Sequence, residues 1–203
     1  MSDPAKILTN LKNSTAEVVT PNGLHFVIRP LDSRDSLNLG AYFLSLSETT
    51  RNWYGPHPFD QTTADRLCAA IDPAHTIRFI GTLPHEGQVV AYFILHLGVY
   101  QNEIKRYGRH KVKLNPQEDC LVAPSVADAY QNQGLGTLVM RHTIDVARHL
   151  GRRRMLLMGG VFIANQRAVH FYRKMGFQTL GTFAKPRRPD RPSYDMYLEI
   201  KDL

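Results

Sequence analysis

The sequence predicts a mixed α/β fold that forms a single domain, and three observations support this prediction. A chain of 203 residues is long enough to bury a proper hydrophobic core in one domain. Apolar residues make up 43% of it and charged residues 21%, which is the composition of an ordinary soluble globular protein. Segments with the apolar period of a strand and of a helix alternate, and the second half has the order strand, helix, strand, helix, strand.

The first segments combine a polar N-terminal stretch with three predicted strands. Residues 1–22 are polar and are expected to pack loosely ahead of a domain that spans residues 23–203. Residues 24–31 alternate apolar with polar or basic side chains, which is the pattern of a strand. Residues 75–83 and 88–100 are rich in β-branched and aromatic side chains and are joined by PHEG, so they form the strongest predicted hairpin.

Two helices and a loop are predicted between these strands. Residues 32–47 begin with Asp and Ser, which are good N-cap residues, and are predicted to be helical. Residues 62–71 indicate a short helix capped by Thr62 or Thr63. Residues 51–60 contain two prolines and a glycine, which predicts a loop.

The middle of the chain leads to a strand, a turn and a helix. Residues 101–117 are basic and polar with no clear period, and we expect a mobile connection there. Residues 119–127 predict a strand, in which Pro124 indicates an edge or a bulge. A helix follows at 134–150, and Gly151 is a natural residue to end it. Its apolar face is formed by Leu135, Val139, Val146 and Leu150.

The last part of the chain alternates strands with one more helix. Residues 154–163 form an apolar run typical of a buried strand. Asn165 is placed to cap the next helix and Gly176 to stop it. The apolar face of this helix consists of Ala168, Phe171, Tyr172 and Met175. The C-terminal strands are predicted within residues 177–200, on either side of the basic segment 184–192.

Composition and charge narrow the class of protein. The formal net charge of +7 favours an acidic partner such as a nucleotide-like cofactor, RNA or an acidic surface, and is equally consistent with solubility alone. The two cysteines, Cys68 and Cys120, form no CxxC motif, so no disulfide framework is expected and a cytoplasmic location fits best. No apolar stretch is long enough for a signal peptide or a membrane helix. The histidines form no HxxxH or HxH pair, so no metal site is expected.

The sequence YQNQGLGT at residues 130–137 predicts a phosphate-binding turn between a strand and a helix. A Walker A loop is excluded because Thr137, rather than a lysine, follows Gly136. A dinucleotide fingerprint is disfavoured because Val139 stands where the third glycine belongs. The remaining pattern, Gln-x-x-Gly-x-Gly, lets backbone N–H groups converge on a pyrophosphate at the start of a helix. A glycine turn that only packs within a βα unit is the alternative.

A second motif, NQRAVHFYRKMGF at residues 165–177, lies on the next predicted helix. Together the two motifs resemble the GNAT family of N-acetyltransferases, and the clear resemblance covers residues 120–183. The resemblance implies a central, twisted, mixed but mostly antiparallel sheet of about six or seven strands, splayed where the cofactor binds and flanked by about four helices. It also implies an acceptor side at residues 23–118 and a cofactor-binding half at residues 119–183. The matching residues are Val126, Gln131, Gly134, Gly136, Asn165, Ala168, Phe171, Tyr172, Gly176 and Phe177.

The resemblance also implies that the cofactor is acetyl-CoA, used as a co-substrate. It assigns the pantetheine arm to the backbone of Val126, Ala127 and Asp128. Asn165 is expected to lie near this arm as well as to cap its helix. The pyrophosphate is assigned to the amides of Gln131, Asn132, Gln133, Gly134, Leu135, Gly136 and Thr137.

Tyr172 is the predicted general acid, because it matches the family tyrosine that reaches towards the CoA sulfur. Its place on the apolar helix face is also compatible with a core tyrosine. The general base is left open between Glu118, Asp119, His57 and water. Cys120 stands where some relatives place a glutamate on the strand before the turn, so a directly placed carboxylate is missing there.

The acceptor site is predicted in the first half, where residues 52–59 gather aromatic side chains on a rigid loop. Candidates for contact with the acceptor are Trp53, Tyr54 and His57, which could instead fold into the core. We therefore expect an N-acetyltransferase that acts on a primary amine of a small molecule, such as an amino sugar or a nucleotide-linked amino sugar. Direct attack in a ternary complex is the expected mechanism.

Two other functions stay open: a protein N-terminal or lysine acetyltransferase, and a non-catalytic acyl-CoA-binding module. The intact tyrosine and glycine turn argue against a loss of catalysis. Basic charge without an RNP-like aromatic motif argues against nucleic acid as the main partner. No membrane partner is expected, and a homodimer is compatible with the sequence. The sequence leaves open whether the donor carries an acetyl group or a longer acyl group.

Overall fold

The computed structural model describes residues 14–84, 87–185 and 188–200. Its strands are β1 (Ala16–Val19), β2 (His25–Pro30), β3 (Thr76–Thr82), β4 (Val89–His96), β5 (Asp119–Val126), β6 (Arg154–Leu157), β7 (Val161–Phe162), β8 (Gln178–Lys185) and β9 (Arg188–Glu199). Its helices are α2 (Ser36–Ser45), α3 (Glu48–Trp53), α4 (Gln61–Ala69), α5 (Gln101–Gly108), α6 (Leu135–His149) and α7 (Gln166–Lys174). Short 3₁₀ turns, η1 (Ser33–Asp35) and η2 (Asp128–Tyr130), precede α2 and the glycine turn.

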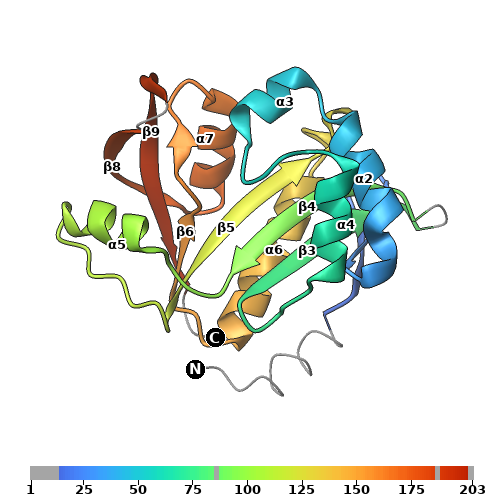
Figure 1. The fold of residues 1–203 in the computed structure, drawn as a ribbon, viewed down its shortest axis with the longest axis horizontal. Helices are drawn as coiled ribbons and strands as arrows, with labels where there is room; N and C mark the ends of the chain where they lie inside the picture. The colour runs from blue at the N-terminus through green and yellow to red at the C-terminus, as the bar shows by residue number, and fades with distance from the viewer. Residues whose placement is uncertain (1–13, 85–86, 186–187, 201–203) are drawn as a thin grey trace.

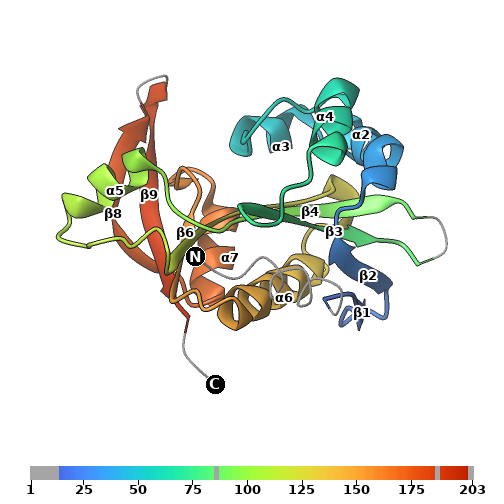
Figure 2. The ribbon, with the colours of Figure 1, turned by 60° about the horizontal axis from the view of Figure 1, so that its bottom comes forward.

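The described strands form one sheet that has helices on both faces. The strand order is β1-β2-β3-β4-β5-β6-β9-β7, and β8 pairs with β9. Helices α2, α3 and α4 lie on one side of the sheet and α6 and α7 on the other (Figure 1, Figure 2). The predicted α/β fold with a mostly antiparallel sheet is confirmed, although the described sheet has nine strands instead of six or seven. Within the described residues, no helix has both the length and the apolar content needed to cross a bilayer.

The centre of the sheet is buried on both sides because helices cover both faces. Every residue of β4 except His96 is buried, in agreement with a strand that has no exposed face. On one side, the ring of Phe43 from α2 packs 5.4 Å from the ring of Tyr92. On the other side, α6 contributes the predicted apolar face. All four of its residues are buried: Leu135, Val139, Val146 and Leu150.

Strands β5 and β6 are parallel, and they stay together for only a short distance. Their register pairs Asp119 with Arg154 at one end and Val122 with Leu157 at the other. The N–H of Met158 still donates to the carbonyl of Val122 at 3.0 Å, and β6 then ends. Strand β5 continues alongside β4 as far as Val126, so its second half has no neighbour on the β6 side. This separation opens the sheet.

Pro124 lies on the unpaired half of β5. The N–H of Ala127 donates to Val90 of β4 at 2.8 Å, and the direction of backbone groups alternates along an antiparallel strand. The backbone of Val122, Pro124 and Val126 therefore faces away from β4, and the proline removes no hydrogen bond between these two strands. The register between β4 and β5 has no shift. Of the two predicted alternatives, the edge is confirmed and the bulge is wrong.

The prediction of a mobile connection at 101–117 is wrong over its first half, where α5 forms. Tyr107 of this helix is fully buried against Leu121 and Leu156, and its hydroxyl donates to the carbonyl of Met196 at 2.9 Å. Glu103 and Tyr107 are its buried residues, so the helix has a low mean hydropathy although its apolar and polar residues are well segregated. Its stability comes from tertiary packing.

Two predicted boundaries before β3 are also wrong. Part of the predicted loop at 51–60 belongs to α3, which Ser47 caps by accepting the N–H of Thr50 at 3.2 Å. Helix α4 is capped by Asp60, whose Oδ1 accepts the N–H of Thr63 at 2.7 Å, and not by a threonine. Both caps are side-chain acceptors of the preferred type, and Asp60 lies just before the predicted start of its helix.

The ends of the chain contain more strand than predicted. Strand β1 lies within the segment 1–22 that was expected to pack loosely, and it pairs antiparallel with β2. The described parts of the basic segment 184–192 lengthen β8 and β9, which pair with each other as far as Lys185 and Arg188, instead of separating two short strands. In both places the strand is stabilised by pairing with another strand, so the local sequence pattern alone does not predict it.

The apolar run at 154–163 forms two strands instead of one. Gly159 and Gly160 both have φ of +68°, and they turn the chain between β6 and β7 so that β7 pairs with β9. A Cβ atom on Gly160 would lie 2.6 Å from the carbonyl oxygen of Tyr194 and 2.7 Å from the ring of Phe183. Only glycine satisfies both the backbone angle and this close approach.

Replacing Gly160 should therefore destabilise the fold more than replacing a glycine that lacks the close contact. We expect Gly160→Ala to lower the free energy of unfolding by about 1–3 kcal/mol more than Gly151→Ala, measured by urea denaturation. Gly151 is a matched control because its φ is +73° and its Cβ would meet nothing within 4 Å. Equal losses for the two variants would contradict the steric explanation.

Candidate active site

A cleft with a volume of about 920 Å³ opens where β5 and β6 separate. Its lining includes the second half of β5, the turn after β6, the glycine turn before α6, and one face of α7. Residues from α3 and α5 line it as well. Helices from both sides of the sheet thus contribute to one cleft.

The edge of β5 supplies backbone groups to this cleft. Pro124 and Val126 line it, and their backbone faces the side from which β6 is missing. The carbonyl of Val126 accepts a hydrogen bond from Nε2 of Gln131 at 2.9 Å. The side chain of Gln131 therefore ties the glycine turn to the end of the strand.

The glycine turn presents a run of free backbone donors. In the described part of the chain, the N–H groups of residues 132–136 donate to no protein acceptor, whereas the N–H of Thr137 already donates to Gly134 at 3.0 Å. Asn132 and Gly134 have φ of +61° and +91°, in the left-handed region that Asn and Gly tolerate. Consecutive free N–H groups at the start of a helix are suited to binding an anion.

The packing around Gly136 leaves room for a side chain, so steric contact within the protein does not explain why this residue is a glycine. It lies in the first turn of α6, and a Cβ atom there would be 3.5 Å from Val126 Cγ2 and 3.8 Å from the ring of Phe171, which are ordinary contacts. Alanine would favour the helix over glycine at this position. A glycine that lines the cleft without a steric reason indicates that a ligand approaches the backbone closely.

Four of the residues that were assigned to the cofactor do not line the cleft and make contacts within the protein instead. They are Ala127, Asp128, Gln133 and Leu135. Ala127 donates its N–H to Val90, and Leu135 is fully buried in the core. The side chain of Gln133 donates to the carbonyl of Ala129 at 2.6 Å. The carboxylate of Asp128 accepts three hydrogen bonds from Ser47 and Thr50 and so fixes the start of α3.

Tyr172 faces the cleft from α7. The side chain is 8% exposed and packs against the rings of Phe171 and Phe177 at 5.3 and 5.4 Å. Its hydroxyl makes no hydrogen bond with the described residues. Burial raises the pKa of Tyr172 above its usual value, so the hydroxyl keeps its proton at neutral pH.

Asn165 has the predicted capping role. Its Oδ1 accepts the N–H of Ala168 at 3.2 Å at the start of α7. Asn165 also lines the cleft, as do Arg167 and Lys174 of the same helix. The helix cap and a position beside a ligand are therefore compatible.

The three residues considered for the general base all lie away from the cleft. Glu118 is a surface residue 3.7 Å from Arg153, at the end of β5 that is far from the glycine turn. Asp119 is fully buried and forms a bidentate ion pair with Arg154 at 2.9 and 3.0 Å. Two engaged carboxylates at the closed end of the sheet have no access to an acceptor.

The ring of His57 packs behind the cleft. Nδ1 lies 2.7 Å from the carbonyl oxygen of Pro58, and Nε2 lies 3.2 Å from the hydroxyl of Tyr92. The imidazole ring is tilted against the ring of Phe43, with the two centroids 5.1 Å apart. Burial lowers the pKa of His57, which favours its neutral form. Its contribution in this geometry is to support the aromatic wall.

Trp53 and Tyr54, the predicted acceptor contacts, line the cleft. The hydroxyl of Tyr54 donates to the carbonyl of Ala123 on β5 at 3.1 Å. The ring of Trp53 lies 5.9 Å from that of Phe162, with the guanidinium of Arg191 at 4.6 Å. Both side chains are thus held rigidly at the mouth of the opened sheet.

Sequence reasoning missed the residues that α5 and β8 bring to the cleft. They are Tyr100, Asn102, Glu103 and Lys185. The spacing of Tyr100, Ile104 and Tyr107 is that of one helix face and could have indicated α5. No sequence signal connects this helix to the cleft, because its position depends on packing against β5 and β6.

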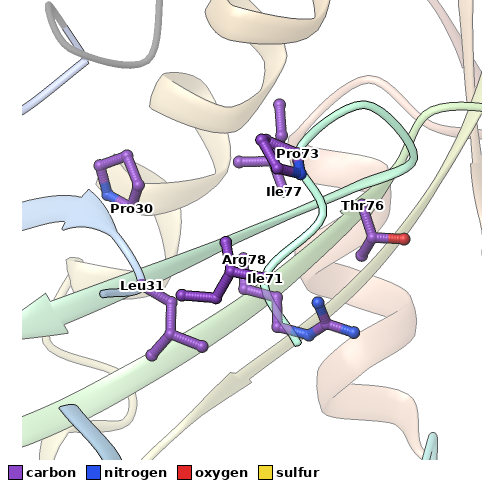
Figure 3. Close-up of a pocket in the computed structure, with 7 residues that line it drawn as sticks. All are labelled: Pro30, Leu31, Ile71, Pro73, Thr76, Ile77 and Arg78. Carbon is purple, nitrogen blue, oxygen red and sulfur yellow. The ribbon is translucent and has the colours of Figure 1, made fainter. Parts of the chain in front are cut away.

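A second hollow of about 150 Å³ lies near the end of β2 (Figure 3). It is lined mainly by apolar side chains, among them Leu31, Ile71 and Ile77, and it contains no acid. Its one cation, Arg78, donates to the hydroxyl of Tyr92 at 3.2 Å. This hollow has no group suited to catalysis. In the described part of the chain, no cluster of three or more side chains is suited to holding a metal ion.

Comparison with known proteins agrees with this geometry. The acetyltransferase (GNAT) family matches residues 42–177. Acetyltransferase PA5475 of Pseudomonas aeruginosa is 28% identical over 137 residues, which cover 66% of this chain and 66% of that protein, just under two thirds of its length.

Several solved structures share the fold. The GNAT domain of S. lividans PAT has a TM-score of 0.71 at 18% identity, over 92% of this chain and 97% of that one. Ribosomal-protein-S5-alanine acetyltransferase from Vibrio fischeri has a TM-score of 0.70 at 14% identity, over 91% and 98%. Mycobacterium smegmatis RimJ in complex with CoA-disulfide has a TM-score of 0.69 at 14% identity, over 91% and 86%. The family match covers most of the chain, and the chain belongs to the GNAT family of acetyltransferases.

Proposed function

We propose that the chain is an acetyl-CoA-dependent N-acetyltransferase that acts on a primary amine of a small molecule, such as an amino sugar or a nucleotide-linked amino sugar. The main support is that one cleft combines the free N–H groups of residues 132–136, the unpaired edge of β5 and the hydroxyl of Tyr172. Transfer is direct, in a ternary complex, since helices from both sides of the sheet line this cleft. Both cysteines are free and buried, which suits a reducing cytoplasm.

The residues present fit acetyl-CoA, which supplies an activated acetyl thioester when bound. The amides of a pantetheine arm can pair with the backbone of Pro124 and Val126 in the manner of an added strand. The pyrophosphate suits the free N–H groups of residues 132–136, where the positive end of the α6 dipole favours negative charge. Arg167 and Lys174 add positive charge on the neighbouring wall of the cleft.

Tyr172 serves as the general acid in this proposal. Burial raises its pKa, so a proton is available at neutral pH for the sulfur that leaves the acetyl group. Trp53 and Tyr54 are assigned to the acceptor because they line the cleft, and Trp53 belongs to α3, which lies on the opposite face of the sheet from α7 (Figure 2). His57 is assigned a supporting role, since both ring nitrogens already have partners.

Acetylation of a protein N-terminus is the second candidate. Its support is the likeness in fold to ribosomal-protein-S5-alanine acetyltransferase from Vibrio fischeri and to ribosomal-protein-S18-alanine N-acetyltransferase from Escherichia coli. A screen that compares amines, amino sugars and peptides by thiol release distinguishes the two candidates. Higher kcat/KM for peptides than for every small amine would replace the first candidate with the second.

Ligand binding provides the first test of the cofactor. We expect acetyl-CoA and CoA at about 100 times their Kd to raise the thermal midpoint by about 5–10 °C, because binding to the native state adds stability. NAD at the same concentration should leave the midpoint unchanged. Differential scanning fluorimetry makes this comparison, and stabilisation by NAD but not by CoA would overturn the proposal.

Gly136→Ala should separate cofactor binding from folding. The added methyl group has room in the helix, so the thermal midpoint should stay the same or rise slightly. Affinity for acetyl-CoA should fall by about tenfold or more, because the methyl group stands where the ligand approaches the backbone. Isothermal titration calorimetry measures the affinity, with Gly108→Ala as a helical control away from the cleft. Unchanged affinity would exclude a close approach at Gly136.

Tyr172→Phe should lower turnover while leaving the cofactor in place. Loss of a general acid predicts a fall in kcat of about 10² to 10⁴-fold, with acetyl-CoA affinity changed less than about twofold. Tyr197→Phe is the control, since its hydroxyl lies 3.5 Å from Gln178 and does not line the cleft. Wild-type kcat in the Tyr172 variant would remove this residue from the mechanism.

A further inference from the structure

Glu103 is a buried acidic side chain that lines the cleft from α5. Only 2% of the side chain is exposed. One oxygen, Oε1, accepts two long hydrogen bonds of 3.4 Å from Arg106 and Asn102. The other oxygen, Oε2, has no hydrogen-bond partner in the described part of the chain. Because a buried carboxylate oxygen without a donor is unfavourable, a donor brought by a ligand would bind there.

Two cations, Arg106 of α5 and Lys185 of β8, interact electrostatically with Glu103. Arg106 makes its short contacts with Asp195, at 2.7 and 2.9 Å, and reaches Glu103 only at 3.4 Å. One guanidinium therefore serves two buried carboxylates, since Asp195 is also fully buried. Glu103 is also the one acidic residue among the described residues that line the cleft. A cationic ligand that donates a hydrogen bond would satisfy the unpartnered oxygen Oε2 of this carboxylate.

Helix α5 places Glu103 on the acceptor side of the sheet. Tyr107, one helical turn further on, packs on Leu121 just before β5 and β6 separate. Leu121 and Ser125 face the same side of β5, and the hydroxyl of Ser125 is 2.6 Å from that of Tyr42 in α2. Helix α5 therefore packs on the face of the sheet that carries α2, opposite α6 and α7 (Figure 2).

Aromatic rings complete this side of the cleft. Trp53 and Tyr100 both line it, and Tyr100 is 46% exposed while its ring stacks on that of His96 at 4.5 Å. Flat ring faces suit the apolar side of a small cyclic or alkyl body, and they also favour a nearby cation. A carboxylate beside such rings forms a site for a compact organic ammonium ion.

We propose that Glu103 binds the acceptor as its ammonium ion and accepts its proton, which restricts the acceptor to compact primary amines that are cationic in solution. This inference depends on the proposed N-acetyltransferase activity. The first proton passes from nitrogen to Oε2 of Glu103 and later to solvent. The nitrogen lone pair then forms the C–N bond, the C–S bond breaks, and the sulfur takes the proton of Tyr172. The second proton of the nitrogen restores the hydroxyl of Tyr172, so charges and atoms balance.

The test is a comparison of Glu103→Gln with the wild-type full chain. Thiol release is followed with the best primary amine from a panel of alkylamines and amino sugars. We expect kcat/KM for the amine to fall by about 10² to 10³-fold, while the Kd for acetyl-CoA changes less than about twofold. Glu118→Gln is the matched control, because Glu118 is a surface residue outside the cleft and should keep wild-type kinetics.

The pH profile distinguishes a proton acceptor from a merely structural residue. The acidic limb of log kcat/KM should be lost in Glu103→Gln and restored in part by Glu103→Asp. Other ionisable groups near Glu103 also contribute to the pH profile. They are Tyr100, Arg106 and Tyr107 from the same region, Lys185 from β8, and Asp195 from β9. An unchanged profile in Glu103→Gln would overturn the assignment.

A second measurement needs no variant. The wild-type protein should bind an amine at least about tenfold more tightly than the alcohol with the same carbon skeleton, such as glucosamine against glucose, because only the ammonium ion neutralises the carboxylate. Equal affinities would overturn the inference. A wild-type protein that binds acetyl-CoA but releases no thiol with any amine would instead refute the proposed function.

Discussion

The separation of β5 from β6 is the feature on which the rest of the structure depends. The two strands pair from Asp119 to Val122 and then part, because the chain after β6 turns at Gly159 and Gly160 towards β9. A parallel sheet interior normally satisfies its own backbone groups. Here half of one strand keeps a free edge inside the molecule, and a proline is tolerated on it. The cleft exists because this edge is not covered.

Buried ion pairs hold the separated strands on either side of the opening. At the closed end, Asp119 of β5 and Arg154 of β6 form a bidentate pair across the parallel register. At the open end, Arg106 of α5 pairs with Asp195 of β9 and connects the long hairpin to the helix that covers it. Removing one member of a buried pair leaves an uncompensated charge, so both pairs fix geometry strongly.

Groups left without partners identify the two halves of the cleft. On one side, the free N–H groups of residues 132–136 are suited to binding an anion, and the free edge of β5 is suited to pairing with the amides of an extended ligand. On the other side, the unpartnered carboxylate oxygen of Glu103 is suited to accepting a hydrogen bond from a cation. Folded proteins satisfy nearly all buried polar groups, so these exceptions are informative. Tyr172 lines the same cleft, and burial raises the pKa of its hydroxyl.

The sequence by itself determined the fold class, the main helices and strands, the cap at Asn165 and the glycine turn, because each depends on local pattern or on conformations that few residues adopt. It did not determine which strands separate, where α5 packs, or that Asp119 is engaged by Arg154. These features depend on contacts between distant segments. The glycine turn before α6 and the cap of α7, which belong to two local motifs, were therefore predictable. The meeting of α3, α5 and β8 at one cleft was decided only by the tertiary structure, since no local spacing records which distant side chains meet.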